Sequence, residues 1–233
     1  MMASLPPFLL TNVHFLHTMS DQELINELAG RTVILANGEF PSHPIPLGVL
    51  ARASRVICCD GAAEKLLATG RRPDMVIGDL DSLPPALRGS VPVQHVAEQE
   101  TNDLSKAFRF CQAQGYGSPV ILGATGLRED HTLGNLSLVA DFAEQAPDLR
   151  LLTDTGCFLA TTTTRTFPCQ PGQTVSIFSF DPTQRLTSRG LKYPLDHLRL
   201  RRWWNATLNT VCNDEFELIL EDPGTVLLYF KYC

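Results

Sequence analysis

Acidic side chains follow two short apolar runs in the first half of the chain, at the points where buried strands should end. The run at 56–59 leads into Asp60, and the run at 75–77 leads into a turn that carries Asp79 and Asp81. Helix formers fill the segment between the runs, so we expect a βαβ unit with parallel strands. Ligands of open parallel sheets bind at the carboxyl ends of the strands. The three carboxylates are therefore expected on one rim of the sheet.

Carboxylates gathered on one rim repel one another unless protons or a cation compensate their charge. Mg²⁺ is the hard cation that suits oxygen ligands beside phosphate groups. A D-x-D pair such as Asp79 and Asp81 also occurs in glycosyltransferases and phosphatases, or as an acidic capping turn. In the phosphatase pattern the first Asp follows the strand directly, whereas Gly78 intervenes here. Further acidic residues follow the other expected strands: Asp60, Asp103 and Asp130. This recurrence favours a magnesium site for phosphate chemistry.

Two further segments carry groups that could bind phosphate. Asp103 lies near the start of an expected helix, and Lys106 follows one turn later, where an ammonium could neutralise phosphate oxygens. The Gly-rich turn at 123–126 could bind an anion through backbone N–H groups, and Arg128 follows it directly. Because phosphoryl transfer depends mostly on positioning and electrostatics, His131 is interpreted as a structural histidine rather than a general base.

The expected elements that position these groups form two regions. Strands at 32–36, 56–59, 75–77, 93–96 and 119–122, with helices at 62–69, 104–114 and 132–143, predict an α/β domain with a parallel sheet. A capping box from Ser20 predicts a short helix before them, and a second short helix is expected at 48–54. Beyond Pro147, Thr- and Val-rich segments at 149–153, 158–164, 174–179, 216–220 and 226–230 predict an antiparallel β-sandwich or small barrel. The predicted division is an extension at 1–30, the α/β domain at 31–148 and the β-sandwich domain at 149–233.

Trp203 and Trp204 are adjacent within the predicted β-sandwich. Neighbouring residues of a strand point to opposite faces, so one of the two indoles is expected to be exposed unless an interface covers it. An aromatic heterocycle or a second subunit could provide that cover.

Composition disfavours several classes of protein and of binding site. A formal charge of −6 and the lack of a long basic run disfavour a nucleic-acid partner. Seven scattered cysteines without C-x-x-C spacing predict neither a disulfide framework nor a zinc site, which favours the reducing cytoplasm. The first residues are apolar, but they have no basic leader region and are too short to span a bilayer, so no membrane association is expected. His14 and His17 lack a matching carboxylate motif and carry little weight as metal ligands.

Five blocks, in this order, resemble the thiamine pyrophosphokinase family over residues from about 31 to 230. They are Asp60-Gly61, Gly78-Asp79-Leu80-Asp81-Ser82, the segment 101–107, the segment 123–135, and Gly190-Leu191-Lys192-Tyr193-Pro194-Leu195. The resemblance implies an ATP-dependent transferase that moves a pyrophosphoryl group to the hydroxyl of thiamine, giving thiamine diphosphate and AMP. It also implies a homodimer that holds thiamine between its subunits.

The resemblance further implies roles for individual residues. The expected metal ligands and catalytic groups are Asp79, Asp81 and Asp103 for Mg²⁺, with Lys106 and Arg128 facing the phosphates. The expected nucleotide-binding residues are Asp60, Gly61, Ser82, Gly123, Thr125 and Gly126. The expected thiamine-binding residues are Gln99, Asp130, Trp204, Thr207 and Asn209. The chain departs from the family pattern at Ala62, Glu64, Leu127 and Leu208.

Two other classes of function stay open from the residues alone. One is another Mg²⁺-dependent phosphate enzyme, such as a phosphatase on a similar core. The other is a non-catalytic sensor of nucleotide or thiamine, which the retained carboxylates disfavour because a sensor could relax their costly clustering.

Overall fold

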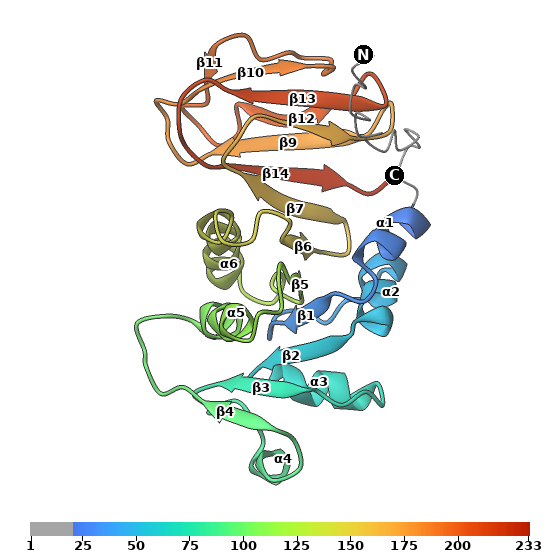
Figure 1. Ribbon diagram of the computed structural model, residues 1–233, viewed down its shortest axis with the longest axis vertical. Helices are drawn as coiled ribbons and strands as arrows, with labels where there is room; N and C mark the ends of the chain where they lie inside the picture. Colours follow the sequence, from blue (N-terminus) through green and yellow to red (C-terminus); the bar gives the residue numbers. More distant parts are fainter. Residues whose placement is uncertain (1–20) are drawn as a thin grey trace, which may run out of the picture.

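One large mixed sheet and one smaller antiparallel sheet organise the chain, whose computed structural model describes residues 21–233 (Figure 1). The first half contains α1 (Asp21–Leu28), β1 (Thr32–Leu35), α2 (Pro44–Arg52), β2 (Arg55–Cys59), α3 (Ala62–Ala68), β3 (Met75–Gly78), α4 (Pro85–Arg88), β4 (Val93–His95), α5 (Asp103–Ala113), β5 (Val120–Leu122), α6 (Glu129–Asp141) and β6 (Arg150–Leu152). The second half contains β7 (Gly156–Thr161), β8 (Arg165–Pro168), β9 (Thr174–Ser179), β10 (Arg185–Arg189), β11 (Leu198–Arg199), β12 (Ala206–Thr210), β13 (Glu215–Leu220) and β14 (Val226–Lys231).

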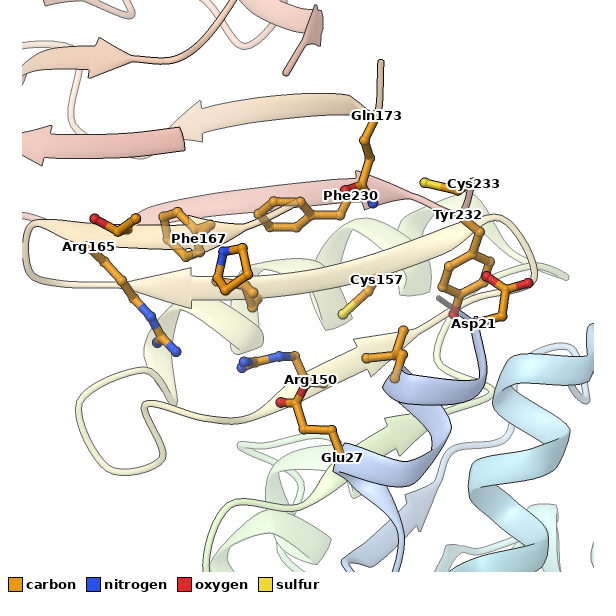
Figure 2. Close-up of a pocket in the computed structure, with 14 residues that line it drawn as sticks. Asp21, Glu27, Arg150, Cys157, Arg165, Phe167, Gln173, Phe230, Tyr232 and Cys233 are labelled. Atoms are coloured by element: carbon orange, nitrogen blue, oxygen red, sulfur yellow. The ribbon is translucent and has the colours of Figure 1, made fainter. Parts of the chain in front are cut away.

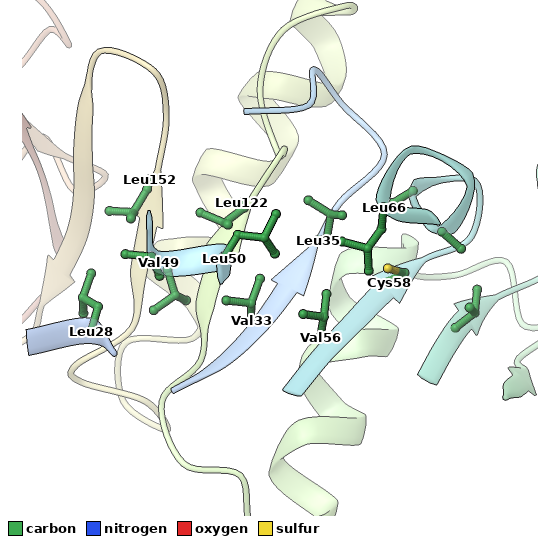
Figure 3. Close-up of a cluster of buried hydrophobic side chains, with 14 of the residues drawn as sticks. Leu28, Val33, Leu35, Val49, Leu50, Val56, Cys58, Leu66, Leu122 and Leu152 are labelled. Carbon is green, nitrogen blue, oxygen red and sulfur yellow. The ribbon is translucent and has the colours of Figure 1, made fainter. Parts of the chain in front are cut away.

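The parallel part of the large sheet has the order β6-β5-β1-β2-β3-β4. Helices α5 and α6 cover one face, and α1 and α2 lie on the other (Figure 1). Successive side chains of β1 point to opposite faces of the sheet, as they do in any β-strand. Val33 and Leu35 pack with Val56 and Leu66 (Figure 3), whereas Ile34 belongs to the cluster on the opposite face. The βαβ unit predicted around α3 is confirmed.

Apolar burial holds α5 and α6 on their face of the sheet. Phe108 of α5 is fully buried, and its ring stacks on Phe142, just after α6, with centroids 3.8 Å apart. Burying a side chain of this size stabilises the fold by roughly 1.5–3 kcal/mol. The start of α5 is therefore fixed relative to the sheet, which matters because Asp103 is its first residue.

The antiparallel half continues the same large sheet. Strand β6 pairs in parallel with β5 and antiparallel with β7, and the sheet extends through β14 and β9 to β12. The small sheet, in the order β11-β10-β13-β8, packs against this extension. Val175, Ile177 and Leu228 of the large sheet meet Phe216 and Leu218 of the small one in a shared core. The predicted fold class, a parallel α/β part with an antiparallel β part, is confirmed, although one sheet spans both parts.

Several local expectations differ from the structure. Helix α2 begins at Pro44, earlier than predicted, because Pro is favourable at the first helical position and His43 Nδ1 accepts a bond from the Ile45 N–H at 3.3 Å. Helix α6 also begins earlier, at Glu129. Strands β8, β10, β11 and β12 were not predicted. Apolar and polar residues alternate only weakly in these four segments, so the sequence does not distinguish them from loops. Their strand conformation depends on pairing and packing within the two sheets.

The expected exposure of a Trp side chain is confirmed, but the expected strand at the Trp pair is wrong. Trp203 and Trp204 lie in a turn that precedes β12, not in a strand, and both are exposed, by 49% and 69%. The Ser20 cap and the pair His14 and His17 fall outside the described residues. None of the helices in the described part of the chain is long and apolar enough to cross a membrane.

Candidate active site

Three carboxylates meet beyond the carboxyl ends of β2 and β3. Oxygens of Asp60, Asp79 and Asp103 lie within 4.8 Å of one another. Asp60 follows β2, Asp79 follows β3, and Asp103 is the first residue of α5. Gly78 permits this approach, since a Cβ there would lie 3.1 Å from the Asp60 Cβ and 3.2 Å from the Asp103 Cγ. A larger residue at this position would push the carboxylates apart.

Asp60 is the most constrained of the three carboxylates. Its φ of 41° is in the left-handed region, where non-glycine residues are uncommon. Its Oδ2 accepts a bond from the Ser82 N–H at 3.0 Å, while its Oδ1 is buried without a hydrogen-bond partner among the described residues. Burial, more than the nearby carboxylates of Asp81 and Asp103, raises the pKa of Asp60 to about 6. A buried orphan oxygen beside two further carboxylates is a donor set that fits Mg²⁺.

Asp79 is held from two sides. Its Oδ1 accepts from the Asp81 N–H at 3.2 Å, and its Oδ2 accepts from Gln99 Nε2 at 3.2 Å. The bond from Gln99 is the main reason that the pKa of Asp79 lies below its ordinary value. Asp81 is exposed and lines the same cavity, but its carboxylate is not one of the three that meet. Asp60 was predicted to bind nucleotide, and Asp81 was predicted to be the third metal ligand. In the structure it is Asp60, not Asp81, whose carboxylate meets those of Asp79 and Asp103.

The start of α5 places a cation beside the carboxylates. Asn102 caps the helix, with its Oδ1 accepting from the Ser105 N–H at 2.9 Å. One turn on, the buried Lys106 places Nζ 3.1 Å from Asp103 Oδ1. Burial raises the pKa of Asp103 and Lys106 opposes that rise, so the ammonium favours the ionised carboxylate. The sequence-based placement of Lys106 next to Asp103 matches this geometry.

A cavity of about 520 Å³ joins these groups to the Gly-rich turn. Of the residues predicted to bind nucleotide or phosphate, Asp60, Ser82, Gly126 and Arg128 line it. It is also lined by residues that the sequence did not single out for binding, namely Asn37, Gly38, Asn102, Leu104, His131 and Asn135. Asn135 Nδ2 donates to the Ala124 carbonyl at 2.8 Å and its Oδ1 accepts from Asn102 at 3.1 Å, which links α6, the turn and α5.

The turn at 123–126 packs directly against the loop after β1. The Gly38 N–H donates to the Gly123 carbonyl at 2.7 Å, and a Cβ on Gly38 would come within 2.6 Å of the Thr125 carbonyl. Gly123 and Thr125 therefore shape the wall without lining the main cavity, and Gly61 similarly packs against Asn37. Leu127 has φ 63° and is 70% exposed, so it occupies a conformation in which a glycine would be unstrained.

Arg128 is paired within its own loop. Its Nε and Nη2 donate to the two oxygens of Asp130 at 3.1 and 2.5 Å, and both side chains are more than 60% exposed. This contact lowers the pKa of Asp130 to about 2. Arg128 lines the cavity, whereas Asp130 does not. Facing a phosphate would require Arg128 to exchange this carboxylate for a substrate oxygen.

The predicted thiamine residues of the β part lie away from this cavity within the single chain. Thr207 Oγ1 donates to the Trp204 carbonyl at 3.0 Å. Asn209 is buried, with its Oδ1 accepting from the Tyr193 N–H at 3.1 Å and its Nδ2 donating to the Tyr193 carbonyl at 2.7 Å. Its amide therefore fixes the loop that carries Tyr193. Their binding of thiamine remains a prediction that needs a second subunit.

Comparison with known proteins identifies both halves of the chain. A family model described as thiamin pyrophosphokinase, catalytic domain, matches residues 48–151, and one described as thiamin pyrophosphokinase, substrate-binding domain, matches residues 156–229. A thiamin pyrophosphokinase of Caenorhabditis elegans is 24% identical over 76% of this chain and 80% of its own. A thiamine pyrophosphokinase of Oryza sativa subsp. japonica is 28% identical over 49% of this chain, and the match spans about half (53%) of the rice protein.

The fold itself recurs in a solved structure. Thiamin pyrophosphokinase from Candida albicans superposes with a TM-score of 0.76 over 97% of this chain and 96% of its own, at 13% sequence identity. The correspondence extends over both the parallel and the antiparallel parts.

Proposed function

Because the chain belongs to the thiamin pyrophosphokinase family of transferases, we propose that it transfers the pyrophosphoryl group of ATP to the hydroxyl of thiamine, giving thiamine diphosphate and AMP. The observation that carries the proposal is the meeting of Asp60, Asp79 and Asp103 in one cavity, with the buried Lys106 paired to Asp103. Such a carboxylate group with an adjacent ammonium suits a metal-bound polyphosphate.

The chain offers carboxylate ligands for Mg²⁺. Asp79 and Asp103 would hold the ion, with Asp60 or Asp81 as a third carboxylate, since all four line the cavity. When bound, Mg²⁺ neutralises phosphate oxygens and favours the charge that develops on them during transfer. Gln99 orients Asp79 through the bond to its Oδ2.

The other residues position the reacting groups. Lys106 offers an ammonium beside Asp103 to oxygens of the transferred group, and Arg128, which lines the cavity, can add a bidentate contact. Asn102 and Asn135 line the cavity, link the start of α5 to α6, and keep the Gly-rich wall in place. Gln99 and Asp130 are proposed as polar anchors for the aminopyrimidine of thiamine. Attack of its hydroxyl at the β-phosphorus of ATP expels AMP, whereas attack at the γ-phosphorus would expel ADP.

The nucleotide product tests the reaction. We expect the protein, incubated with Mg·ATP and thiamine, to form AMP and thiamine diphosphate in equal amounts, measured by separating both on an anion-exchange column. Omission of thiamine should abolish AMP formation, and chelation of the metal should do the same. Formation of ADP with thiamine monophosphate, or ATP breakdown indifferent to thiamine, would contradict the proposal and favour a different phosphate enzyme.

We further propose that the active protein is a homodimer assembled through its β part, with thiamine held between subunits. Six large apolar side chains of the described residues are exposed there: Phe180, Tyr193, Leu198, Trp203, Trp204 and Leu208. Phe180 and Trp203 meet edge to face with centroids 5.7 Å apart, so part of the surface is already ordered. Exposed apolar groups of this size are typical of an interface.

The dimer proposal predicts a change of mass on surface substitution. We expect the wild-type protein to sediment at twice the chain mass, and the double substitution Trp204→Ser with Leu208→Ser to shift it toward the monomer because both side chains are more than two-thirds exposed. Leu47→Ser, at an exposed leucine of α2, is the matched control and should leave the mass unchanged. A fully active wild-type monomer would contradict the shared site.

A further inference from the structure

A second cavity, of about 350 Å³, opens between α1 and the strands β7, β8 and β14 (Figure 2). Its apolar wall is formed by Leu24, Leu159, Phe167 and Phe230. Two guanidinium groups enter it from different strands, Arg150 from β6 and Arg165 from β8, and lie on the same side of the cavity in Figure 2. None of its lining residues belongs to the carboxylate cavity.

Arg150 is buried with few partners. Only 8% of the residue is exposed, and its one recorded hydrogen bond joins Nη1 to the Leu149 carbonyl at 3.2 Å. A guanidinium carries five N–H donors, so most of this group's capacity is available to the cavity. No described Asp or Glu forms an ion pair with it. The carboxylates of Asp21 and Glu27 line the same cavity, but neither forms an ion pair with Arg150. A buried charge without a direct ion pair is costly, and an anion that binds to it recovers part of that cost.

A neighbouring cavity of about 830 Å³ shares Arg150 and Arg165 and gathers more positive charge. Its charged lining comprises four arginines, which are Arg31, Arg55, Arg150 and Arg165, and two carboxylates, which are Glu27 and Asp148. Burial, and next the charge of Arg150, lower the pKa of Arg31 below its ordinary value. The carboxylate of Asp148 lies 3.4 Å from Arg165, but the Asp148 side chain is 65% exposed. Arginines therefore outnumber carboxylates in the lining of this larger cavity, whereas in the smaller cavity Arg150 and Arg165 are matched by Asp21 and Glu27.

This basic site lies at the opposite end of the parallel strands from the carboxylates. Arg150 and Arg55 are the first residues of β6 and β2, whereas Asp60 follows the last residue of β2. A ligand at the arginines would thus be separated from the catalytic cavity by the length of the sheet. The transfer reaction gives no role to this group of arginines.

We propose that Arg150 and Arg165 form a second, anion-binding site, which takes a small molecule with a phosphate or carboxylate group attached to an apolar body. The two guanidinium groups bind the oxyanion, for which their planar forks are well suited. The apolar body packs against Leu24, Phe167 and Phe230 in the smaller cavity. The combination of a charged end and an apolar wall distinguishes this ligand class from free inorganic phosphate.

The test measures binding in buffer with EDTA, because without a divalent cation the aspartates of the other cavity repel anions. Phenyl phosphate, benzoate and inorganic phosphate are the probes. We expect the first two to raise Tm by about 5 °C near a hundredfold excess over Kd, and inorganic phosphate to bind more weakly. Equal effects of all three, or none, would overturn the proposal.

Matched variants locate the binding. In Arg150→Met we expect calorimetry to show phenyl phosphate bound at least roughly tenfold more weakly, because a charge-assisted contact is lost. Arg189→Met, at an exposed arginine of β10, is the control and should bind like the wild type. Loss of binding in Arg128→Met but not in Arg150→Met would place the anion in the catalytic cavity and refute the proposal.

A second variant keeps the test decisive if Arg150→Met fails to fold. Arg165→Met alters a side chain that is one-third exposed and should also weaken phenyl phosphate several-fold. We expect Arg150→Met itself to be no less stable than the wild type without ligand, because it removes a buried, poorly compensated charge. Wild-type affinity in Arg165→Met would contradict a shared two-arginine site.

Discussion

Replacing Asp79 or Asp103 by Asn is expected to lower the rate of AMP formation by roughly 100-fold or more while the fold survives. Each substitution removes one negative charge from carboxylates whose oxygens lie within 4.8 Å of one another. The amide is nearly isosteric, so packing around Gly78 is retained, while a ligand charge for Mg²⁺ is lost. Turnover at saturating Mg·ATP and thiamine measures the effect, and circular dichroism measures the fold.

The same series decides which carboxylate completes the metal site. Asp60 meets the other two with an orphan oxygen, whereas Asp81 is exposed and lies outside the trio. We therefore expect Asp60→Asn to lower turnover, and raise the Mg²⁺ concentration needed for half activity, more than Asp81→Asn does. Asp141→Asn, at the exposed last residue of α6, is the control and should keep the wild-type rate.

Thermal stability separates the loss of function from the loss of structure. Without Mg²⁺ the Asn variants should have a Tm equal to or above that of the wild type, because like charges repel less. With Mg²⁺ only the wild type should gain stability, since only it retains the complete site. If the variants unfold, or if they retain near-normal rates, the assignment of these residues to the metal is wrong.

Replacing Lys106 by Met is expected to lower turnover by roughly 100-fold and also to destabilise the protein. The ammonium is buried, with Nζ 3.1 Å from Asp103 Oδ1, so its removal leaves a half-buried carboxylate among two others without a compensating cation. Breaking a buried pair from one side is strongly destabilising. The measurements are kcat and urea unfolding, with Lys231→Met at an exposed lysine of β14 as the control.

A double substitution distinguishes the two roles of Lys106. In Lys106→Met with Asp103→Asn the unpaired charge is gone, so we expect stability to return toward the wild-type value. Activity should stay low, because neither the metal ligand nor the ammonium is restored. Lys106→Arg should retain part of the wild-type rate, since arginine keeps the positive charge but carries it on a longer, planar group. If Lys106→Met retained near-wild-type turnover, the ammonium would not act on the phosphates.

Local sequence patterns determined the parts of this protein that depend on a few neighbouring residues. The apolar runs before Asp60 and Asp79, with a helix between them, predicted parallel strands and a shared rim, because a βαβ crossover forces both strands to end at the same edge. The spacing of Asp103 and Lys106 predicted one helical turn between them, and the structure has both on α5. The five ordered motifs indicated the family, which the two family models confirm.

Tertiary packing decided what depends on contacts between distant segments. Asp60 joins Asp79 and Asp103 because a left-handed backbone at Asp60 and the absent side chain of Gly78 allow close approach, and neither is encoded by spacing alone. The turn at Trp203 and Trp204 was mistaken for a strand, since Trp is favoured in strands and only the course of the chain into β12 shows otherwise. Likewise, Arg150 and Arg165 lie fifteen positions apart without a motif, and they share a cavity only because β6 and β8 bring them to the same wall. The surroundings of these residues are set by contacts between segments that are distant in sequence, so the sequence by itself could not predict their roles.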